Sequence, residues 1–208
     1  MQTLESFKTI HISTQNRKLG VAIPSINLPA ITTCRANAPC RKGCYACKGT
    51  FLYSNVQQSL QNNLDIYKES PEAYFSQIQA YLTLIPYKLF RWHSSGDIVD
   101  KKYFELMIKL AKKCKDTQFL CFTKKFEIVN EWLDNHKSLP KNLIIVFSCW
   151  GGFNPENPHN LPKTYVKFGN EELDKFIPKS AFKCSGHCET CQLCWNLKKG
   201  QAVYFNKH

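Results

Sequence analysis

Eight of the eleven cysteines in this chain stand in two short runs, and thiols this close together can bind a metal centre. The first cysteine run has the spacing C-x5-C-x3-C-x2-C and consists of Cys34, Cys40, Cys44 and Cys47. The second cysteine run has the spacing C-x3-C-x2-C-x2-C and consists of Cys184, Cys188, Cys191 and Cys194. Zinc sites usually contain two C-x2-C pairs separated by a longer loop, whereas each run here is dense. We therefore expect one or two [4Fe–4S] clusters, with zinc as the alternative.

The remaining cysteines and two histidines are candidates of lower specificity. Cys114 falls in an expected helix and Cys121 in an expected strand, where a cysteine usually packs as a small hydrophobic residue. Cys149 and His93 each follow an expected strand, so each is either a site residue or a buried core residue. His208 is the last residue, and it either folds back as a metal ligand or belongs to a frayed terminus.

The elements that position these residues alternate between strands and helices. Apolar runs predict strands over residues 18–26, 87–93, 118–123 and 143–148. Amphipathic periodicity and capping residues predict helices over 54–69 (capped by Ser54), from Pro71 onward (capped by Ser70), from Asp100 to about Cys114, and over 126–135. Strands this apolar, alternating with helices, indicate a parallel sheet covered on both faces.

We therefore predict an α/β fold, either a partial (β/α) barrel or an open parallel sheet, with a Cys-rich C-terminal metal-binding module. The α/β domain would comprise residues 1–178 and include the cysteine loop at 34–47, and the module would comprise 179–208 and pack against it. Functional groups in such folds collect at the carboxyl ends of the strands. Polar or reactive residues follow each expected strand, namely the first cysteine run, Ser94–Asp97, Thr123–Lys125 and Ser148–Trp150. We expect these segments to form one shared site.

The composition excludes some classes of protein and favours others. The 208 residues carry a net charge of +12, and residues 1–50 and 179–208 contribute +6 and +4 of it. No apolar run approaches the roughly 20 residues that a membrane span needs, and the N-terminus has no apolar signal segment. We therefore expect a protein of the reducing cytoplasm that does not enter a membrane. The basic excess partly balances thiolate charge, and the remainder makes nucleic acid a possible partner. The oligomeric state is not readable from the sequence.

The segment Cys40-Arg-Lys-Gly-Cys44-Tyr-Ala-Cys47 resembles the cluster-binding loop of radical S-adenosylmethionine (SAM) enzymes, because it is a C-x3-C-x2-C triplet that follows the first expected strand. The resemblance implies that three thiolates hold three irons of a [4Fe–4S] cluster, and that the fourth iron stays open for SAM. In these enzymes the next strand ends in a Gly-Gly-Glu-like motif, to which Ser95-Gly96-Asp97 is similar. A second four-cysteine centre near the C-terminus resembles the auxiliary cluster of many members.

The same resemblance assigns roles to residues near the second expected strand. The cofactor-binding candidates are Ser95, Gly96 and Asp97, and the catalytic candidates are Asp97, Arg91 and His93. Arg91 and Lys124 would bind a phosphate or carboxylate of the substrate. Cys34 would stay outside an open cluster, whereas in a purely structural centre it would be the fourth ligand.

A second resemblance covers residues 20–208. The segments Val21-Ala-Ile-Pro-Ser, Thr33-Cys34, Phe90-Arg-Trp-His-Ser-Ser-Gly-Asp97 and Cys194-Trp195 are similar to an uncharacterised Cys-rich family encoded by bacteriophages and mobile elements. That resemblance implies action in the host cytoplasm. Two functions stay open. One is a radical-SAM-like enzyme that acts on an unknown substrate, with nucleotides and nucleic acid among the candidates. The other is a non-catalytic nucleic-acid-binding phage protein stabilised by zinc or iron–sulfur centres.

Overall fold

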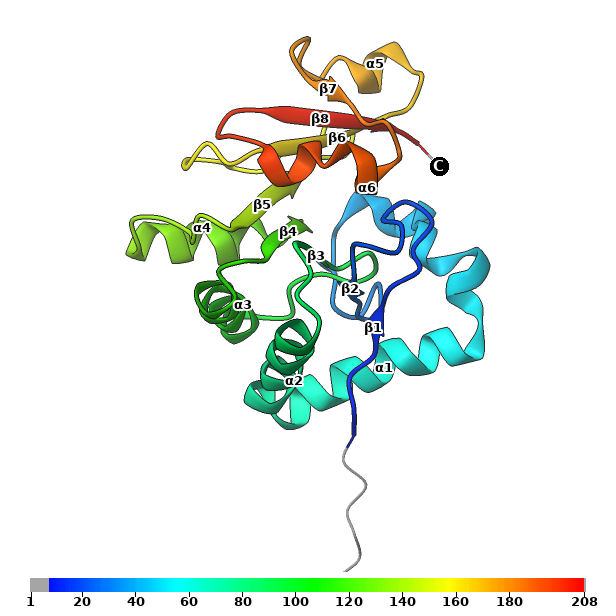
Figure 1. Ribbon diagram of the computed structural model, residues 1–208. Coiled ribbons are helices and arrows are strands. Elements are labelled where there is room, and N and C mark those ends of the chain that lie inside the picture. Colours follow the sequence, from blue (N-terminus) through cyan, green and yellow to red (C-terminus); the bar gives the residue numbers. More distant parts are fainter. Residues whose placement is uncertain (1–7, 208) are drawn as a thin grey trace, which may run out of the picture.

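The computed structural model describes residues 8–207, and one eight-stranded, mostly parallel sheet runs through them (Figure 1). Its strands are β1 (Ile12–Ser13), β2 (Ser25–Ile26), β3 (Leu89–Trp92), β4 (Gln118–Thr123), β5 (Leu143–Ser148), β6 (Lys163–Lys167), β7 (Phe182–Lys183) and β8 (Ala202–Asn206). The spatial order is β1-β2-β3-β4-β5-β6-β8-β7, and β1 pairs antiparallel with β2 while the other pairs run parallel. The fold is therefore the open parallel sheet, one of the two predicted alternatives.

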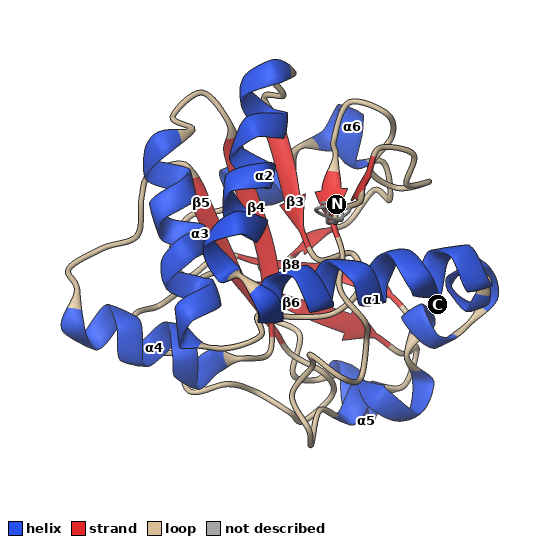
Figure 2. Cartoon of the chain, turned by 90° about the horizontal axis from the view of Figure 1, so that it is seen from below, coloured by secondary structure: helices blue, strands red, loops and turns tan. Residues whose placement is uncertain are grey.

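Four long helices cover one face of this sheet, and Figure 2 shows them in front of the strands. They are α1 (Ser54–Glu69), α2 (Pro71–Leu84), α3 (Lys101–Lys113) and α4 (Phe126–Asn135). The shorter elements are α5 (Glu171–Asp174), α6 (Cys188–Cys191) and the 3-10 turns Pro39–Gly43, Tyr45–Cys47, Gly49–Leu52 and Leu193–Asn196. The helices enclose a core rich in aromatic rings, including Tyr74, Phe90, Trp92, Tyr103 and Phe119. Within residues 8–207, no helix has the length and apolar character that a membrane crossing requires.

The opposite face of the sheet is covered by irregular segments instead of long helices. Leu19 and Ile23 from the N-terminal segment pack there with Trp195 and Leu197 from the C-terminal segment. The indole Nε1 of Trp195 donates a hydrogen bond of 3.4 Å to the carbonyl oxygen of Phe90 in β3. Both faces are therefore covered, as the apolar strands predict, and the two chain ends meet on the face that lacks long helices.

The helix starts follow the predicted capping residues in two of three cases. The Ser70 hydroxyl accepts a hydrogen bond from the backbone N–H of Ala73 at 3.3 Å, and Asp100 Oδ1 accepts one from Tyr103 at 2.8 Å. These bonds satisfy N–H groups that have no partner inside the helix. Ser54, however, is the first residue of α1 rather than its cap, and Tyr53 before it forms no capping side-chain bond.

One strand prediction is wrong, and three strands were not predicted. The strand predicted over 18–26 contains only Ser25–Ile26, because residues 16–20 form a turn in which Gly20 N–H donates to Asn16 O at 2.8 Å. No strand was predicted after residue 148, yet this part of the chain contributes β6, β7 and β8, with β8 between β6 and β7. Strands from both sides of residue 178 therefore share one sheet, and the division into two domains stays a prediction.

Candidate metal centres and the carboxyl edge of the sheet

The first cysteine run occupies the loop that follows the carboxyl end of β2 and precedes α1. Two contacts fix this loop against the segment after β3. The Tyr45 hydroxyl donates a hydrogen bond to the carbonyl oxygen of Ser94, and the backbone N–H of Asp97 donates to Thr33 Oγ1 at 3.1 Å. The structure thus brings together two of the segments that the sequence predicts at one site. Tyr45 and Thr33 were not among the predicted site residues, although both lie beside the cysteines.

The segment Ser94–Asp97 is also joined to the end of β2. Asn27 Oδ1 accepts hydrogen bonds from the backbone N–H groups of Ser94 at 2.7 Å and Ser95 at 3.2 Å. Leu28 exchanges two further bonds with Ser95, since its N–H donates to Ser95 O at 3.0 Å and its carbonyl accepts from Ser95 Oγ at 2.9 Å. The Ser95 hydroxyl, a predicted cofactor ligand, therefore contacts the protein itself, and its cofactor role stays a prediction.

Gly96 allows this close approach of two loops. Its φ is +84°, a left-handed conformation that side chains with a Cβ rarely adopt. A Cβ at this position would lie 2.8 Å from the Leu28 carbonyl oxygen and 2.8 Å from Thr33 Oγ1. The sequence predicts a close backbone approach to a cofactor at Gly96, and the structure shows a close approach to the loop after β2.

The carboxylate of Asp97 joins the ends of β3 and β4. Its Oδ1 accepts hydrogen bonds from Ile98 N–H at 2.8 Å and Thr123 Oγ1 at 2.6 Å, and its Oδ2 accepts from Lys124 N–H at 2.9 Å. Burial raises the pKa of Asp97, and these hydrogen bonds oppose the shift. Because two carboxylate oxygens accept about four hydrogen bonds, one position remains for another donor. Asp97 thus orients the third predicted segment, Thr123–Lys125, and its cofactor and catalytic roles stay predictions.

The thiols of the first cysteine run lie close enough to influence one another. Burial, together with the charges of Asp97, Cys44 and Cys40, raises the pKa of Cys34 to about 11. Burial also raises the pKa of Cys44, which lies beside Cys47. A thiol with a raised pKa stays protonated at neutral pH unless a bound cation displaces the proton. Four thiols in one loop are a suitable donor set for a thiolate-bound metal. No three His, Cys, Asp or Glu side chains of residues 8–207 are arranged as a metal site, so metal binding stays a prediction.

The second cysteine run lies on the face of the sheet that lacks long helices. Cys188 and Cys191 belong to α6, and Cys184 and Cys194 flank it. Cys184, Cys188 and Cys194 are half-buried against the apolar cluster that contains Leu120 and Val146. The backbone N–H of Cys188 donates to Lys18 O at 2.9 Å, and Glu189 Oε1 accepts from Ala22 N–H at 3.0 Å. The N-terminal segment therefore holds this run in place.

Arg91 lies between the two cysteine runs. Its guanidinium stacks 4.1 Å from the centre of the Phe122 ring, and its Nε donates to the Trp92 carbonyl at 3.0 Å. Among residues 8–207 no carboxylate forms an ion pair with it. Its charge instead acts on the Tyr45 hydroxyl and on the thiols of Cys188 and Cys194. The predicted substrate-binding cation therefore stands where it would balance the charge of a thiolate centre.

His93 lies on the helix-covered side of the sheet. Its φ is +56°, and its Nε2 is 2.9 Å from the Tyr103 hydroxyl, while its Nδ1 is buried without a partner among the described residues. Burial, together with the charge of Arg91, lowers the pKa of His93 to about 3. The imidazole is therefore neutral at pH 7 and stacks near Trp92 and Tyr103. This placement favours the core-histidine alternative, and a catalytic role stays a prediction.

The three cysteines outside the two runs are buried or half-buried. Cys121 is fully buried in β4, and Cys114 packs against the helix-side core, as predicted for small hydrophobic residues. Cys149 is buried with Tyr165 and Ala202, and burial raises the pKa of its thiol to about 11. His208, the alternative metal ligand, lies outside the described residues.

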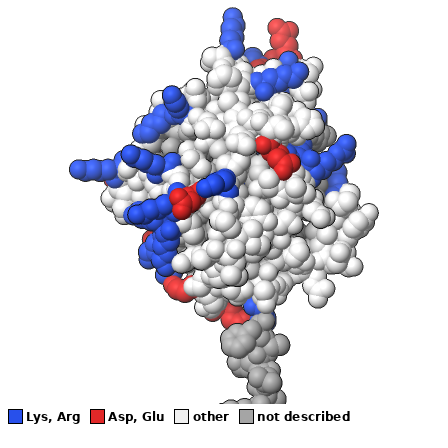
Figure 3. Space-filling model, in the orientation of Figure 1, with Lys and Arg blue, Asp and Glu red and all other residues white. Residues whose placement is uncertain are grey.

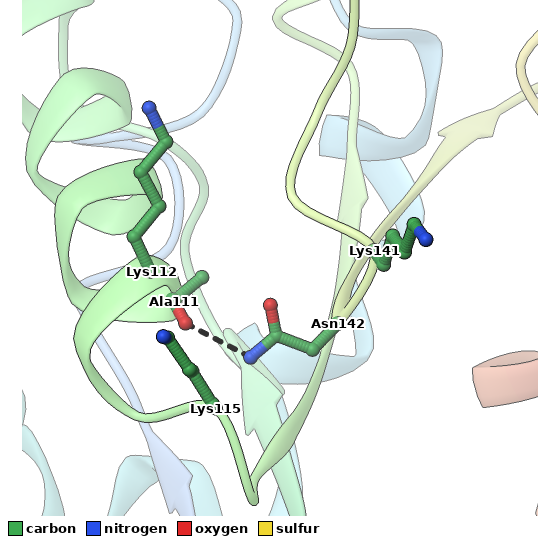
Figure 4. Close-up of a pocket in the computed structure, with 5 residues that line it drawn as sticks. All are labelled: Ala111, Lys112, Lys115, Lys141 and Asn142. Atoms are coloured by element: carbon green, nitrogen blue, oxygen red, sulfur yellow. Dashed lines mark hydrogen bonds between the residues drawn. The ribbon is translucent and has the colours of Figure 1, made fainter.

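Lysines surround a shallow hollow at the opposite, amino edge of the sheet. The hollow has a volume of about 320 Å³ and is lined by Ala111, Lys112, Lys115, Lys141 and Asn142. Figure 4 shows that Lys112 and Lys141 point in different directions, while the Asn142 amide donates to the Ala111 carbonyl at 2.9 Å. Many blue side chains of Figure 3 gather on the side where Figure 1 places α3 and α4. The hollow is basic, but its lysines do not converge on one ligand position.

The fold and the two cysteine runs define an α/β protein with an open, mostly parallel sheet and a cysteine-rich loop at its carboxyl edge. Residues 5–170 match the model of the family Gene product 88 (GP88), so the chain belongs to this family. The phage gene-product resemblance seen in the sequence is thereby confirmed, whereas no comparison supports the radical SAM resemblance. No curated protein and no solved structure matches the chain.

Proposed function

We propose that this GP88 protein is an iron–sulfur enzyme of the radical SAM type, acting in the host cytoplasm, with its catalytic centre at the first cysteine run. One observation carries the proposal. The cysteine loop follows the first strand of the parallel part of the sheet, and contacts from Tyr45 and Thr33 hold it against Ser94–Asp97 after the neighbouring strand. The cysteine loop and an acidic Gly-containing segment are thus adjacent at the carboxyl edge, where α/β enzymes bind their ligands.

The residues of this edge have separate tasks in the proposed enzyme. Cys40, Cys44 and Cys47 would hold a [4Fe–4S] cluster, which when bound supplies the electron that cleaves the S–C5′ bond of SAM. Asp97 would accept a hydrogen bond from the SAM amino group at its remaining lone pair. Its three hydrogen bonds within the protein keep the carboxylate in place for this task. Cys34 would stay outside the cluster as a neutral thiol.

The second cysteine run would hold an auxiliary metal centre. A centre bound by four thiolates carries net negative charge, because the deprotonated ligands outweigh the metal. Arg91 stands beside Cys188 and Cys194 with no carboxylate partner among residues 8–207, so a negative centre would provide the missing counter-charge. A half-buried cation is costly without such a partner. The position of Arg91 therefore supports a metal–thiolate centre over four neutral thiols.

A second function follows if the hydrogen bonds of Asp97 to Ile98, Thr123 and Lys124 serve only to stabilise the sheet edge. With the net charge of +12, this supports the alternative of structural zinc or iron–sulfur centres in a nucleic-acid-binding protein.

Anaerobic purification and reconstitution, followed by iron, sulfide and zinc analysis, test the proposal. We expect a brown protein that forms 5′-deoxyadenosine when dithionite and SAM are added. Cys44→Ala should lose this activity, while Cys114→Ala, outside both runs, should keep it. A colourless protein with bound zinc would reject the proposed enzyme. Iron–sulfur content without any 5′-deoxyadenosine, together with salt-dependent RNA or DNA retention, would establish the second function instead.

A further inference from the structure

A second hollow lies beside the first cysteine run at the carboxyl edge of the sheet. Its volume is about 210 Å³, and it is lined by Arg35, Phe126, Glu127, Asn130, Phe153, Asn154, Pro155 and Glu156. Arg35 directly follows Cys34, Phe126 begins α4 after β4, and residues 153–156 belong to the loop after β5. The segments that follow β2, β4 and β5 thus converge on one hollow. None of its lining residues was among the predicted site residues.

Arg35 is fixed in position on the aromatic wall of this hollow. Its guanidinium carbon lies 5.7 Å from the ring centres of both Phe126 and Phe153. Its Nη1 pairs with the Glu127 carboxylate, and its Nε donates to Asn37 Oδ1 at 2.8 Å. Its Nη2 group has no partner among the described residues, so two N–H donors remain for a ligand. The guanidinium is held without using all of its donors.

Asn130 supplies an unsatisfied acceptor to the same hollow. Its Nδ2 donates to the Glu156 carbonyl at 3.0 Å, and its Oδ1 is buried without a partner among the described residues. The bond to Glu156 fixes the orientation of the amide, because a flipped amide would place two oxygens face to face. A buried acceptor without a partner is destabilising, and a ligand N–H group would remove that cost.

These groups suit one kind of ligand. A flat ring that packs against Phe126 and Phe153, with an acceptor for Arg35 and an N–H donor for Asn130, would complement them. The volume is below the roughly 300 Å³ at which pockets for drug-sized ligands begin, so only one ring system fits. Lys124 and Lys125, which precede Phe126, form no ion pair with a carboxylate among residues 8–207 and could meet a phosphate outside the hollow.

We infer that this hollow binds a nucleobase, with the attached sugar and phosphate outside it on the side of Lys124 and Lys125. Nucleobases combine a flat face with donor and acceptor groups on one edge, and aromatic side chains bind their faces. The inference rests on the proposed function, because it names the class of substrate that the proposed enzyme would bind at this edge of the sheet. Binding itself requires no metal, so the two can fail separately.

Calorimetric titration of the full-length reconstituted protein with the four ribonucleoside 5′-monophosphates, and with a ten-nucleotide single-stranded RNA, tests the inference. Phe153→Ala and Arg35→Lys should each weaken binding about tenfold or more, since each removes a stacking face or a charge-assisted hydrogen bond. Lys141→Ala, which removes a charge from the distant amino-edge hollow, is the matched control and should retain the affinity of the unmodified protein.

The ligand can be varied as well as the protein. If adenosine monophosphate binds, purine riboside 5′-monophosphate, which lacks the amino group, should bind more weakly, and Asn130→Ala should remove this difference. Tighter binding of the RNA than of any monophosphate would assign the hollow to an unstacked base of a strand, and the reverse order would assign it to a free nucleotide. Absence of binding by all probes would overturn the inference. So would an equal loss in Phe153→Ala and Lys141→Ala, since that would indicate general surface charge.

Discussion

Gly96→Ala tests whether the contact between the loops after β2 and β3 is as close as the structure shows. Two costs are expected. The left-handed conformation at φ +84° costs a residue with a Cβ about 1–2 kcal/mol. The new Cβ would also lie 2.8 Å from the Leu28 carbonyl oxygen, which is backbone and cannot rotate away, and overpacking of this kind costs about 1–3 kcal/mol. The free energy of unfolding should therefore fall by about 2–5 kcal/mol.

Gly169→Ala provides a matched control. Gly169 has a similar φ of +75°, but a Cβ there would meet no heavy atom within 4 Å. This substitution should cost only the conformational part, about 1–2 kcal/mol. Urea unfolding of both variants at neutral pH, followed by circular dichroism, measures the difference, which isolates the contact at Leu28. If the two variants lose the same stability, the close approach of the two loops is refuted.

Three further outcomes concern the cysteine runs and their neighbours. Cys34→Ala should leave the iron content almost unchanged, while Cys44→Ala removes the iron of the first cysteine run and leaves any iron of the second, because an open cluster needs three thiolates. Equal losses in an iron assay would show four ligands. The pKa of His93 is lowered to about 3 in the folded protein, whereas it is about 6.5 in the unfolded chain. Between these values only the unfolded chain binds a proton at His93, so the free energy of unfolding falls as the pH falls. Between pH 7 and 5 the unmodified protein should lose about 2 kcal/mol more than His93→Asn in urea titrations, and parallel pH curves would contradict the lowered pKa. Arg91→Met should release metal from the second cysteine run to a chelator faster than Arg91→Lys, because it removes the cation beside Cys188; equal rates would exclude this role.

The central α/β unit can be predicted from local sequence patterns alone. The elements β4, α4 and β5 have the bounds that apolar runs and helical periodicity predict, since continuous burial on both faces leaves an unambiguous pattern. Ser70 and Asp100 cap their helices as predicted, because capping depends on groups within one helical turn. The dense cysteine spacing likewise identified both candidate metal loops without any tertiary information.

The arrangement of these local elements depends on contacts between segments that are distant in the sequence. β8 lies between β6 and β7, and strand pairing between distant segments is not encoded in the pattern of one segment. The roles of Gly96 and Asp97 depend on the loop after β2 and on the end of β4, which approach them only in the folded chain. The hollow around Arg35 and Asn130 is made from three separate loops, and its unsatisfied donors and acceptor exist because tertiary packing uses some groups and leaves others without partners.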